Sequence, residues 1–310
     1  MPIPRRTFLK FAALGLGAAV SSQTQEAEAV QAPTGYPDSR GVLVDLTECI
    51  GCRKCEWRCN EVNGLPPRPP SDFEDKSVFE RTRRTHADTF TVVNRFANAA
   101  DPEKPVYVKK QCMHCQEPAC ASVCFVKAFT KQPSGAVTYD PSLCMGCRYC
   151  MAACPFNIPA YQYDDAFTPE VTKCTFCFER TQAEGTQPGC VEVCPVEALT
   201  YGKRSDLIEL AHARIWSRPG RYVDHVYGEK EVGGTSWMYL SAAPFDQVGF
   251  RTDLGETPIP ALSRGFLSMV SVVLMTWPLL CMLFRQSAKS AEKDAEGGAP
   301  EPDAREEESR

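Results

Sequence analysis

The chain has 310 residues and a formal charge of −5, from 34 Lys and Arg against 39 Asp and Glu. Hydrophobic residues make up 43% and charged residues 24%, which is ordinary for a folded body. These values exclude a generally disordered chain and a polytopic membrane protein, and they argue against a strongly basic nucleic-acid binder.

The N-terminal residues 1–29 have the features of an export signal. Arg5 and Arg6 are followed by Thr7-Phe8-Leu9-Lys10, which resembles a twin-arginine motif. An apolar run over residues 11–20 and an Ala-x-Ala pattern at 27–29 come next. The run is too short to span a membrane. We therefore expect a twin-arginine signal peptide that exports the folded protein to the periplasmic side of a bacterial inner membrane.

Residues 30–205 are expected to form a domain built on cysteine, because they hold sixteen of the 17 cysteines in four quartets. The first and third quartets have the spacing of bacterial ferredoxins, and the other two keep x2 at the start and x3 at the end. The quartets are Cys49-x2-Cys52-x2-Cys55-x3-Cys59, Cys112-x2-Cys115-x4-Cys120-x3-Cys124, Cys144-x2-Cys147-x2-Cys150-x3-Cys154 and Cys174-x2-Cys177-x12-Cys190-x3-Cys194.

The spacing has a chemical reason. Three closely spaced thiolates let one loop hold three corners of a 4Fe–4S cubane. Gly51 and Gly146 leave room for backbone N–H groups to approach the sulfurs. We expect the fourth cysteine on the first turn of a helix, where it points away and ligates the other cluster of a pair. The four quartets therefore predict four 4Fe–4S clusters with all sixteen cysteines as ligands.

Three alternatives compete for these cysteines. Disulfides suit an exported protein, but the repeated C-x2-C-x2-C pattern brings three sulfurs too close together for a clean pairing scheme. Zinc sites favour two C-x2-C knuckles over three-cysteine loops with a fourth member. A mixed set, in which one site holds a different cluster or none, is suggested by Asn60 and Phe125, which replace the proline found after the other two quartets.

Charges near the quartets are expected to offset about −2 per oxidised cluster and to tune its potential. His114, between Cys112 and Cys115, is expected either to donate a hydrogen bond near a cluster or to lie exposed in its loop. The basic residues close to the quartets are Arg53, Lys54, Arg58, Lys109, Lys110, Arg148 and Lys173.

The segments around the quartets predict both strands and helices. Residues 89–96 and 106–110 are rich in β-branched and aromatic residues and are expected to pair, and 136–139 is a short strand candidate after a Ser134-Gly135 turn. These pieces favour α+β, ferredoxin-like lobes that each hold two clusters. Residues 206–262 are expected to form a C-terminal periplasmic extension with a helix over 206–216, capped by Ser205, and a strand over 237–240.

Near the C-terminus, Gly265–Phe284 is a stretch of 20 residues without a charge. That length crosses a hydrocarbon core of about 30 Å. The flanking basic residues place the following tail in the cytoplasm by the positive-inside rule. The expected fold class is thus α+β, with two ferredoxin-like double-cluster lobes, a single transmembrane helix within 263–285 and an acidic cytoplasmic tail over 286–310.

No catalytic constellation is visible in the sequence. It contains no Gly-x-Ser-x-Gly, no P-loop and no pair of histidines spaced for zinc. A chain that only carries electrons needs no substrate pocket, so we expect no catalytic residues.

Three segments resemble a known family: Lys109–Cys115, Cys144–Pro155 and Tyr227–Thr235. They are similar to the four-cluster ferredoxin-like iron–sulfur (beta) subunits of respiratory oxidoreductases, and most of all to the electron-transfer subunit of membrane-bound nickel–iron hydrogenases of the hydrogenase-2 type. The resemblance implies a relay between a periplasmic catalytic subunit, a nickel–iron hydrogenase, and a quinone-reactive integral-membrane subunit. One alternative is the beta subunit of formate dehydrogenase or another molybdopterin oxidoreductase. An alternative of another class is a membrane-anchored zinc-binding assembly module.

The resemblance also implies a crossed ligation. The first and fourth quartets would form one lobe, which faces the catalytic subunit, and the middle two would form the other, which faces the membrane subunit. The implied ligand sets are Cys49, Cys52, Cys55 and Cys194; Cys174, Cys177, Cys190 and Cys59; Cys112, Cys115, Cys120 and Cys154; and Cys144, Cys147, Cys150 and Cys124.

Overall fold

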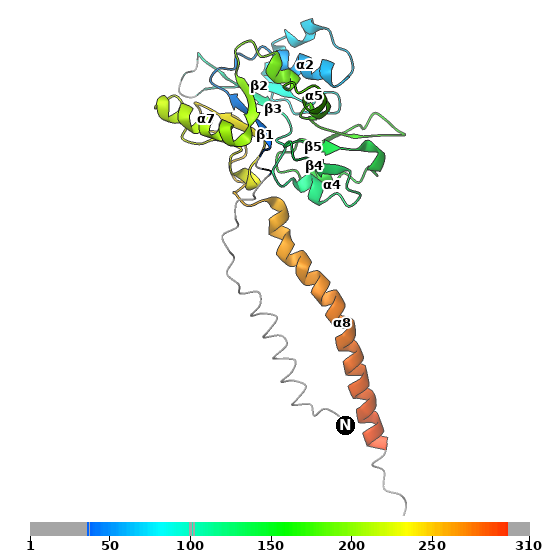
Figure 1. Ribbon diagram of the computed structural model, residues 1–310. Coiled ribbons are helices and arrows are strands. Elements are labelled where there is room, and N and C mark those ends of the chain that lie inside the picture. The colour runs from blue at the N-terminus through cyan, green and yellow to red at the C-terminus, as the bar shows by residue number, and fades with distance from the viewer. Residues whose placement is uncertain (1–35, 37, 99–100, 102, 297–310) are drawn as a thin grey trace, which may run out of the picture. The chain divides into compact units, whose positions relative to one another are not determined.

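The computed structural model describes residues 36, 38–98, 101 and 103–296 (Figure 1). The described residues up to Leu262 belong to one compact unit, and the described residues from Ser263 onwards belong to a second unit. The expected twin-arginine signal peptide and the part of the expected acidic tail after residue 296 lie outside the described residues.

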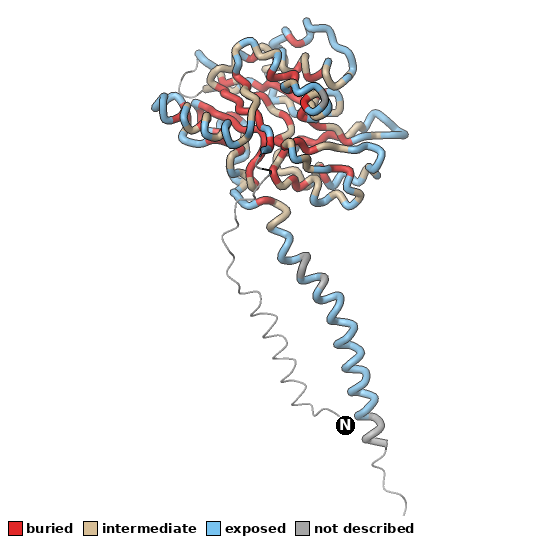
Figure 2. The backbone as a smooth tube through the Cα atoms, viewed as in Figure 1, coloured by how far each residue is buried: buried red, intermediate tan, exposed pale blue. Residues whose placement is uncertain are grey.

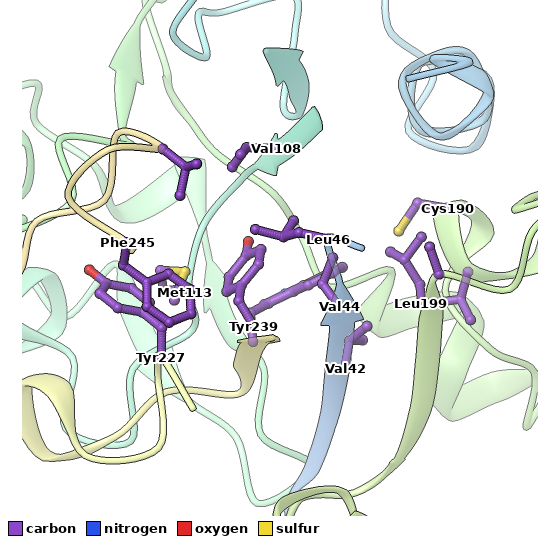
Figure 3. Close-up of a cluster of buried hydrophobic side chains, with 14 of the residues drawn as sticks. Val42, Val44, Leu46, Val108, Met113, Cys190, Leu199, Tyr227, Tyr239 and Phe245 are labelled. Atoms are coloured by element: carbon purple, nitrogen blue, oxygen red, sulfur yellow. The ribbon is translucent and has the colours of Figure 1, made fainter. Parts of the chain in front are cut away.

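The core of the first unit is a three-stranded sheet in the order β8-β1-β9. Strand β1 (Arg40–Asp45) pairs antiparallel with β8 (Leu199–Lys203) and parallel with β9 (Trp237–Leu240). Alternate side chains of a strand point to opposite faces. Val42 and Val44 accordingly join one apolar cluster, while Leu43 joins another beneath helix α7 (Arg204–Ser217). Figure 3 shows the first cluster, in which Val42 and Val44 lie near Leu199 and Tyr239.

Three hairpins surround this sheet. The largest joins β2 (Val92–Phe96) to β3 (Val106–Lys110) in antiparallel register, which confirms the predicted pairing. The second joins β4 (Phe129–Lys131) to β5 (Val137–Tyr139) through a turn containing Gly135, and this confirms the predicted short strand. The third joins β6 (Ala160–Tyr161) to β7 (Val171–Thr172).

Short helices follow the cysteine loops. They are α2 (Lys54–Val62), α3 (Ala119–Ser122), α4 (Tyr149–Ala153), α5 (Phe178–Ala183) and α6 (Gly189–Glu192). Helix α2 packs against α6, and α3 packs against α4. The first quartet therefore lies beside the fourth, and the second beside the third. Single 3₁₀ turns cover Pro70–Phe73, Ser77–Glu80, Pro141–Leu143 and Glu231–Gly233.

Helix α7 confirms the predicted helix, but its predicted cap is wrong. The N-cap position is Lys203, the last residue of β8, and no side chain caps the helix. The hydroxyl of Ser205 bonds to the carboxylate of Asp206, and the Arg204 N–H is satisfied by the carbonyl of Ser39 in the chain next to β1. Direct continuation from the strand thus sets the start of this helix.

The long helix α8 (Ile259–Glu296) includes the residues for which a membrane anchor was expected, and residues 286–296 of the expected tail continue it. A spanning helix needs about 20 consecutive, mainly apolar residues. In the described part of the chain, no helix offers a stretch both long and apolar enough to cross a membrane. The predicted transmembrane helix is therefore wrong. Figure 2 shows buried residues concentrated within the first unit, whereas the described residues of α8 beyond Ser263 are exposed.

Candidate metal centres

The cysteine loops turn through left-handed backbone conformations. In the first quartet Gly51 has φ +65° and Arg53 has φ +64°, and in the third Gly146 has φ +72° and Arg148 has φ +60°. The turn brings the N–H of Gly146 to 3.5 Å from the sulfur of Cys144. This contact supports the expectation that glycine lets a backbone donor approach the sulfur, and the two ferredoxin-spaced loops share one backbone shape.

The other two quartets reach a similar shape without glycine. His114 has φ +48° in the second quartet, and Phe176 has φ +60° in the fourth. The N–H of Phe176 points to the sulfur of Cys174 at 3.4 Å. All four loops therefore turn back on themselves, and in the third and fourth a backbone N–H comes close to a cysteine sulfur.

The fourth cysteine of each quartet does not lie on the first turn of a helix, and this expectation is wrong. Cys59 lies in the second half of α2, Cys154 directly follows α4, and Cys124 and Cys194 lie just beyond α3 and α6. The short helix instead carries the third cysteine, and the x3 spacing advances the chain by about one turn to the fourth.

A tight turn follows three of these fourth cysteines. The N–H groups of Lys127, Asn157 and Glu197 donate to the carbonyls of Cys124, Cys154 and Cys194 at 3.0, 3.1 and 3.3 Å. The quartet that carries Phe125 in place of proline thus makes the same turn as the two with proline. After Cys59 the chain stays helical, and the Asn60 amide donates to the carbonyl of Pro66 at 3.2 Å.

Cysteines from distant quartets come together in the fold. None of the 17 cysteines, all of which lie in described residues, forms a disulfide. The groups are identified by electrostatic contacts between thiols, and for Cys124 by a shared apolar cluster. They are Cys49, Cys52, Cys55 and Cys194; Cys59, Cys174, Cys177 and Cys190; Cys112, Cys115, Cys120 and Cys154; and Cys144, Cys147 and Cys150 with Cys124. The first three groups have the same members as the implied ligand sets. Cys124 shares an apolar cluster with Cys144 and Cys150 but also with Cys120, so its place in the fourth set, like ligation itself, stays a prediction.

The thiols lie where a free thiolate is unfavourable. Burial raises the pKa of Cys49 and Cys150 to about 11 and that of Cys120 and Cys174 to about 12. Metal binding requires the deprotonated thiolate, and the bound metal in turn compensates its charge. Buried thiols grouped in fours therefore fit a metal cluster as donor sets.

Among the residues that the structure describes, no group of three or more His, Cys, Asp or Glu side chains is arranged to hold a single metal ion. A cubane presents four separate iron corners, so its thiolates are held further apart than the ligands of one ion.

A buried cation lies among the cysteines of the first and fourth quartets. Lys109, in β3, is 2% exposed, and its ammonium donates to the Gln111 side chain at 2.8 Å and lies 4.5 Å from the Trp237 ring centre. Burial lowers its pKa, but Cys190 and Cys55 raise it more, so the net shift is upward. Gln111 in turn donates to the Tyr239 hydroxyl at 2.6 Å. A polar network thus holds this ammonium deep in the protein.

Two lysines lie near the second quartet. Lys131, which the sequence analysis missed, donates to the carbonyls of His114 and Gly135 at 3.2 and 2.7 Å, and burial lowers its pKa to about 8. Lys173 is 5% exposed and donates to the carbonyls of Val137 and Cys174. Lys131 belongs to a short strand outside every quartet, so its proximity to the second quartet is visible only in the fold.

His114 is fully buried, so the exposed alternative is wrong. Its Nδ1 accepts from the Val137 N–H at 2.9 Å, and burial, then Lys173 and Lys131, hold its pKa well below the ordinary value. The neutral ring therefore carries its proton on Nε2, and a backbone hydrogen bond with Cys174 of the neighbouring cysteine loop opposes the downward shift of the pKa.

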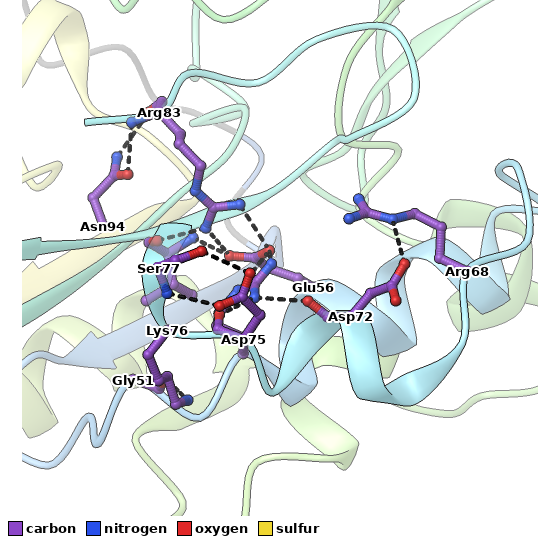
Figure 4. Close-up of polar contacts among 11 residues, drawn as sticks. Gly51, Glu56, Arg68, Asp72, Asp75, Lys76, Ser77, Arg83 and Asn94 are labelled. Atoms are coloured by element: carbon purple, nitrogen blue, oxygen red, sulfur yellow. Dashed lines mark hydrogen bonds and ion pairs between the residues drawn. The ribbon is translucent and has the colours of Figure 1, made fainter. Parts of the chain in front are cut away.

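Arg53 does not act as a free charge, although it was expected to offset cluster charge. Its guanidinium pairs with the buried carboxylate of Glu56 at 3.0 Å, and Arg83 binds the same carboxylate at 2.5 Å (Figure 4). Glu56 also accepts from the Val93 N–H at 2.6 Å. This network ties α2 to β2 and positions the first cysteine loop.

The two halves of the cysteine-rich region meet through aromatic rings. The rings of His114 and Phe176, each between two cysteines of its own loop, lie 4.9 Å apart. Cys112 is an electrostatic neighbour of Cys174. The second and fourth quartets are therefore adjacent across this junction.

The cysteines differ in their access to solvent. Cys147 is exposed, whereas the other fifteen quartet cysteines are partly or fully buried. Exposed apolar side chains surround its loop, including Met145 and Tyr149, and Arg148 links that loop to Tyr163. The third quartet thus lies at an apolar surface.

A groove of about 1100 Å³ reaches Cys177 of the fourth quartet and is lined by charged side chains of both signs.

Comparisons with known proteins identify iron–sulfur relatives. Residues 104–204 match the family described as 4Fe-4S dicluster domain. A protein of Nitratidesulfovibrio vulgaris is 55% identical over 299 residues, which are 94% of this chain and 80% of that protein. The hydrogenase-2 operon protein HybA of Shigella flexneri is 35% identical over 277 residues, 79% of this chain and 82% of HybA. The nitrate-inducible formate dehydrogenase iron-sulfur subunit of Escherichia coli is 34% identical over 208 residues, 64% of this chain and 66% of that subunit.

Proposed function

We propose, given that the chain belongs to the family of iron–sulfur subunits of respiratory oxidoreductases, that it relays electrons between a nickel–iron hydrogenase and a quinone-reactive membrane subunit. The chain is an iron–sulfur electron-transfer subunit that binds 4Fe–4S clusters. Bound clusters of this type supply one-electron storage and transfer. The single observation that carries the proposal is that cysteines from distant quartets come together in the fold, so that each of three groups combines members of two quartets.

We propose that the chain binds four 4Fe–4S clusters, one for each group of cysteines. The groups that contain Cys194 and Cys59 combine the first and fourth quartets, and the group that contains Cys154 combines the second and third. The packing of α2 on α6 and of α3 on α4 supports this pairing. Helix α2 then carries one ligand for each of two sites, whereas α3, α4 and α6 each carry one ligand and are followed directly by a ligand of the neighbouring site.

The proposed path runs from the first quartet through the fourth and second to the third. The neighbouring thiols Cys174 and Cys112, with the packed rings of His114 and Phe176, support a short step between the two lobes. The exposed Cys147 and its apolar surroundings support the third quartet as the end that meets a partner. We assign that partner as the quinone-reactive subunit and place the hydrogenase beside the first quartet.

The proposed location is the periplasmic side of the inner membrane, after export by the twin-arginine route. The support is the Arg5-Arg6 sequence with its apolar run and Ala-x-Ala pattern. Export in the folded state suits a chain whose ligand sets combine residues far apart in the sequence. Attachment to the membrane is assigned to the partner subunit.

Formate dehydrogenase is the second candidate for the catalytic partner. It is favoured by the likeness to formate dehydrogenase iron-sulfur subunits, which extends to a Haemophilus influenzae protein that is 32% identical over 238 residues. A gene for a nickel–iron large subunit beside this one supports the hydrogenase, and a gene for a molybdopterin subunit supports the alternative.

Metal analysis and co-purification test the proposal together. The protein matured anaerobically in its host should contain about 16 iron atoms per chain and show brown absorbance. Gentle solubilisation should recover it with hydrogenase subunits and a membrane subunit, identified by mass spectrometry. A zinc-containing, colourless protein would instead support an assembly module and refute the relay.

A further inference from the structure

We propose that Lys109 is the shared counter-charge of the two clusters held by the first and fourth quartets, and that it raises both of their reduction potentials. This inference rests on the proposed function, because it requires those clusters. It goes further in assigning to one side chain a role in setting the energy of electrons in one lobe.

Because the ammonium group of Lys109 is buried, a negative charge has to lie close to it. A buried charge is stable only when it is paired or bound to a metal site. The ammonium contacts a neutral amide oxygen and an aromatic face, and among the described residues no carboxylate pairs with it. The two arginines of the first quartet differ from Lys109, because Arg53 pairs with Glu56, and Arg58 pairs with Glu61 and Glu192.

The surroundings of Lys109 identify that anion. Its electrostatic neighbours include Cys55 of one ligand set and both Cys190 and Cys174 of the other. Trp237, whose ring lies under the ammonium, belongs to the same apolar cluster as Cys55 and Cys190. The missing negative charge is therefore that of the two clusters.

The redox consequence follows from charge alone. One electron, supplied by the redox partner, takes a cluster with its four thiolates from about −2 to about −3, and no proton is required. A nearby positive charge stabilises the more negative state, which raises the potential. Since one ammonium neighbours both sets, it shifts two potentials in the same direction.

The matched comparison is with the second quartet. Lys131 neighbours Cys115 and Cys112 and has no cysteine of the first or fourth quartet among its main electrostatic contacts. Lys110, next to Lys109 in β3, donates to the carbonyl of Gly249 and lies over the rings of Phe96 and Phe250. Lys131→Met therefore removes a positive charge beside a different cluster. Lys110→Met removes a positive charge that does not neighbour a cluster.

The test is a reductive titration followed by electron paramagnetic resonance on the purified, iron-loaded complex. In Lys109→Met, two of the cluster signals should shift to more negative potential, each by about tenfold in the one-electron equilibrium constant, or about 59 mV. Lys131→Met should shift a different signal, and Lys110→Met none. Unchanged signals in Lys109→Met, or the same signals shifted in Lys109→Met and Lys131→Met, would overturn the proposal.

Two controls separate this inference from folding and from the proposed function. Lys109→Arg keeps the charge and should keep the potentials of the wild type. If Lys109→Met loses iron while Lys109→Arg retains it, the positive charge is required even for cluster binding, which supports the proposal. Loss of iron in both variants overturns the proposal, because it shows that the lysine side chain is needed for packing and not for its charge. Wild-type protein without iron would refute the proposed function itself, while iron-loaded protein with unshifted potentials refutes only the role of Lys109.

Discussion

Gly51 lies where the first cysteine loop has no room for a side chain. Its φ is +65°, and an added Cβ would lie 2.3 Å from the ring of Tyr107. Gly64 has a similar φ of +59°, but nothing lies within 4 Å of the Cβ position. Substitution of the two glycines therefore distinguishes the energetic cost of the left-handed backbone conformation from the cost of a steric clash.

Gly51→Ala should destabilise the loaded protein by about 2–4 kcal/mol, since strained backbone and overpacking each cost about 1–3 kcal/mol. Gly64→Ala should cost only about 1 kcal/mol, from backbone conformation. The temperature at which the brown absorbance is lost measures both. Equal effects of the two variants would show that Tyr107 does not restrict the loop.

His225 predicts a pH dependence of stability. Its ring bonds to the Glu231 carboxylate at 2.6 Å, which raises the pKa of His225, while the pKa of Glu231 is lowered because that bond and backbone donors outweigh its burial. A raised histidine pKa stabilises the folded state fully below the ordinary value of about 6.5, and this contribution is lost as the pH rises through the folded pKa.

The variant His225→Gln should therefore lose more stability at pH 5.5 than at pH 8, because the contribution of the protonated ring decreases as the pH rises through its folded pKa. Glu231 stays ionised at the lower pH because its pKa is depressed. The difference between the losses of stability at the two pH values should stay below about 1 kcal/mol, because the ion pair is partly exposed to solvent. Thermal loss of absorbance at the two pH values measures it, with His86→Gln as control. A loss independent of pH would contradict the assigned ion pair.

At the scale of elements, Glu56 joins helix α2 to strand β2. Its carboxylate, 1% exposed, is shared by Arg53 and Arg83. Removing one partner of a buried ion pair leaves uncompensated charge and costs about 3–5 kcal/mol. Glu56→Ala should lower stability by that amount, as measured by thermal loss of absorbance. The nearby, exposed pair of Arg68 and Asp72 is the control, because Asp72→Ala should cost no more than about 1 kcal/mol.

The local elements were predictable from sequence, whereas the central sheet was not. Strands β2 and β3 are rich in β-branched residues and close in sequence, so their pairing was confirmed. Strand β1 finds its neighbours in β8 and β9, which lie far along the chain. No local pattern encodes that meeting, because tertiary packing decides which distant segments pair.

The same distinction applies to the charges around the cysteines. Lys109 and Arg53 are two of seven basic residues near the quartets in the sequence. Only Arg53 has a local sign of neutralisation, because Glu56 lies three residues after it on one helix. The isolation of Lys109 and the proximity of Lys131 depend on strands that only the fold brings together.

At the scale of the whole molecule, the crossed ligand sets make a prediction. Cys154 belongs to the third quartet in sequence but neighbours Cys112 and Cys115 in space. Cys154→Ala should therefore remove the same paramagnetic signal as Cys115→Ala, and leave the signal that Cys147→Ala removes. Coincidence of the Cys154→Ala and Cys147→Ala spectra would refute the crossed assignment.

The place of β1 in the sheet constrains how this polypeptide is made. Residues 40–45 leave the ribosome early, yet the strand beside them at 237–240 is synthesised late. Cys49 likewise waits for Cys194 before its group is complete. The proposed cluster at that group can therefore be completed only after residue 194 has been synthesised, and the nascent chain has to stay unaggregated and unoxidised until then.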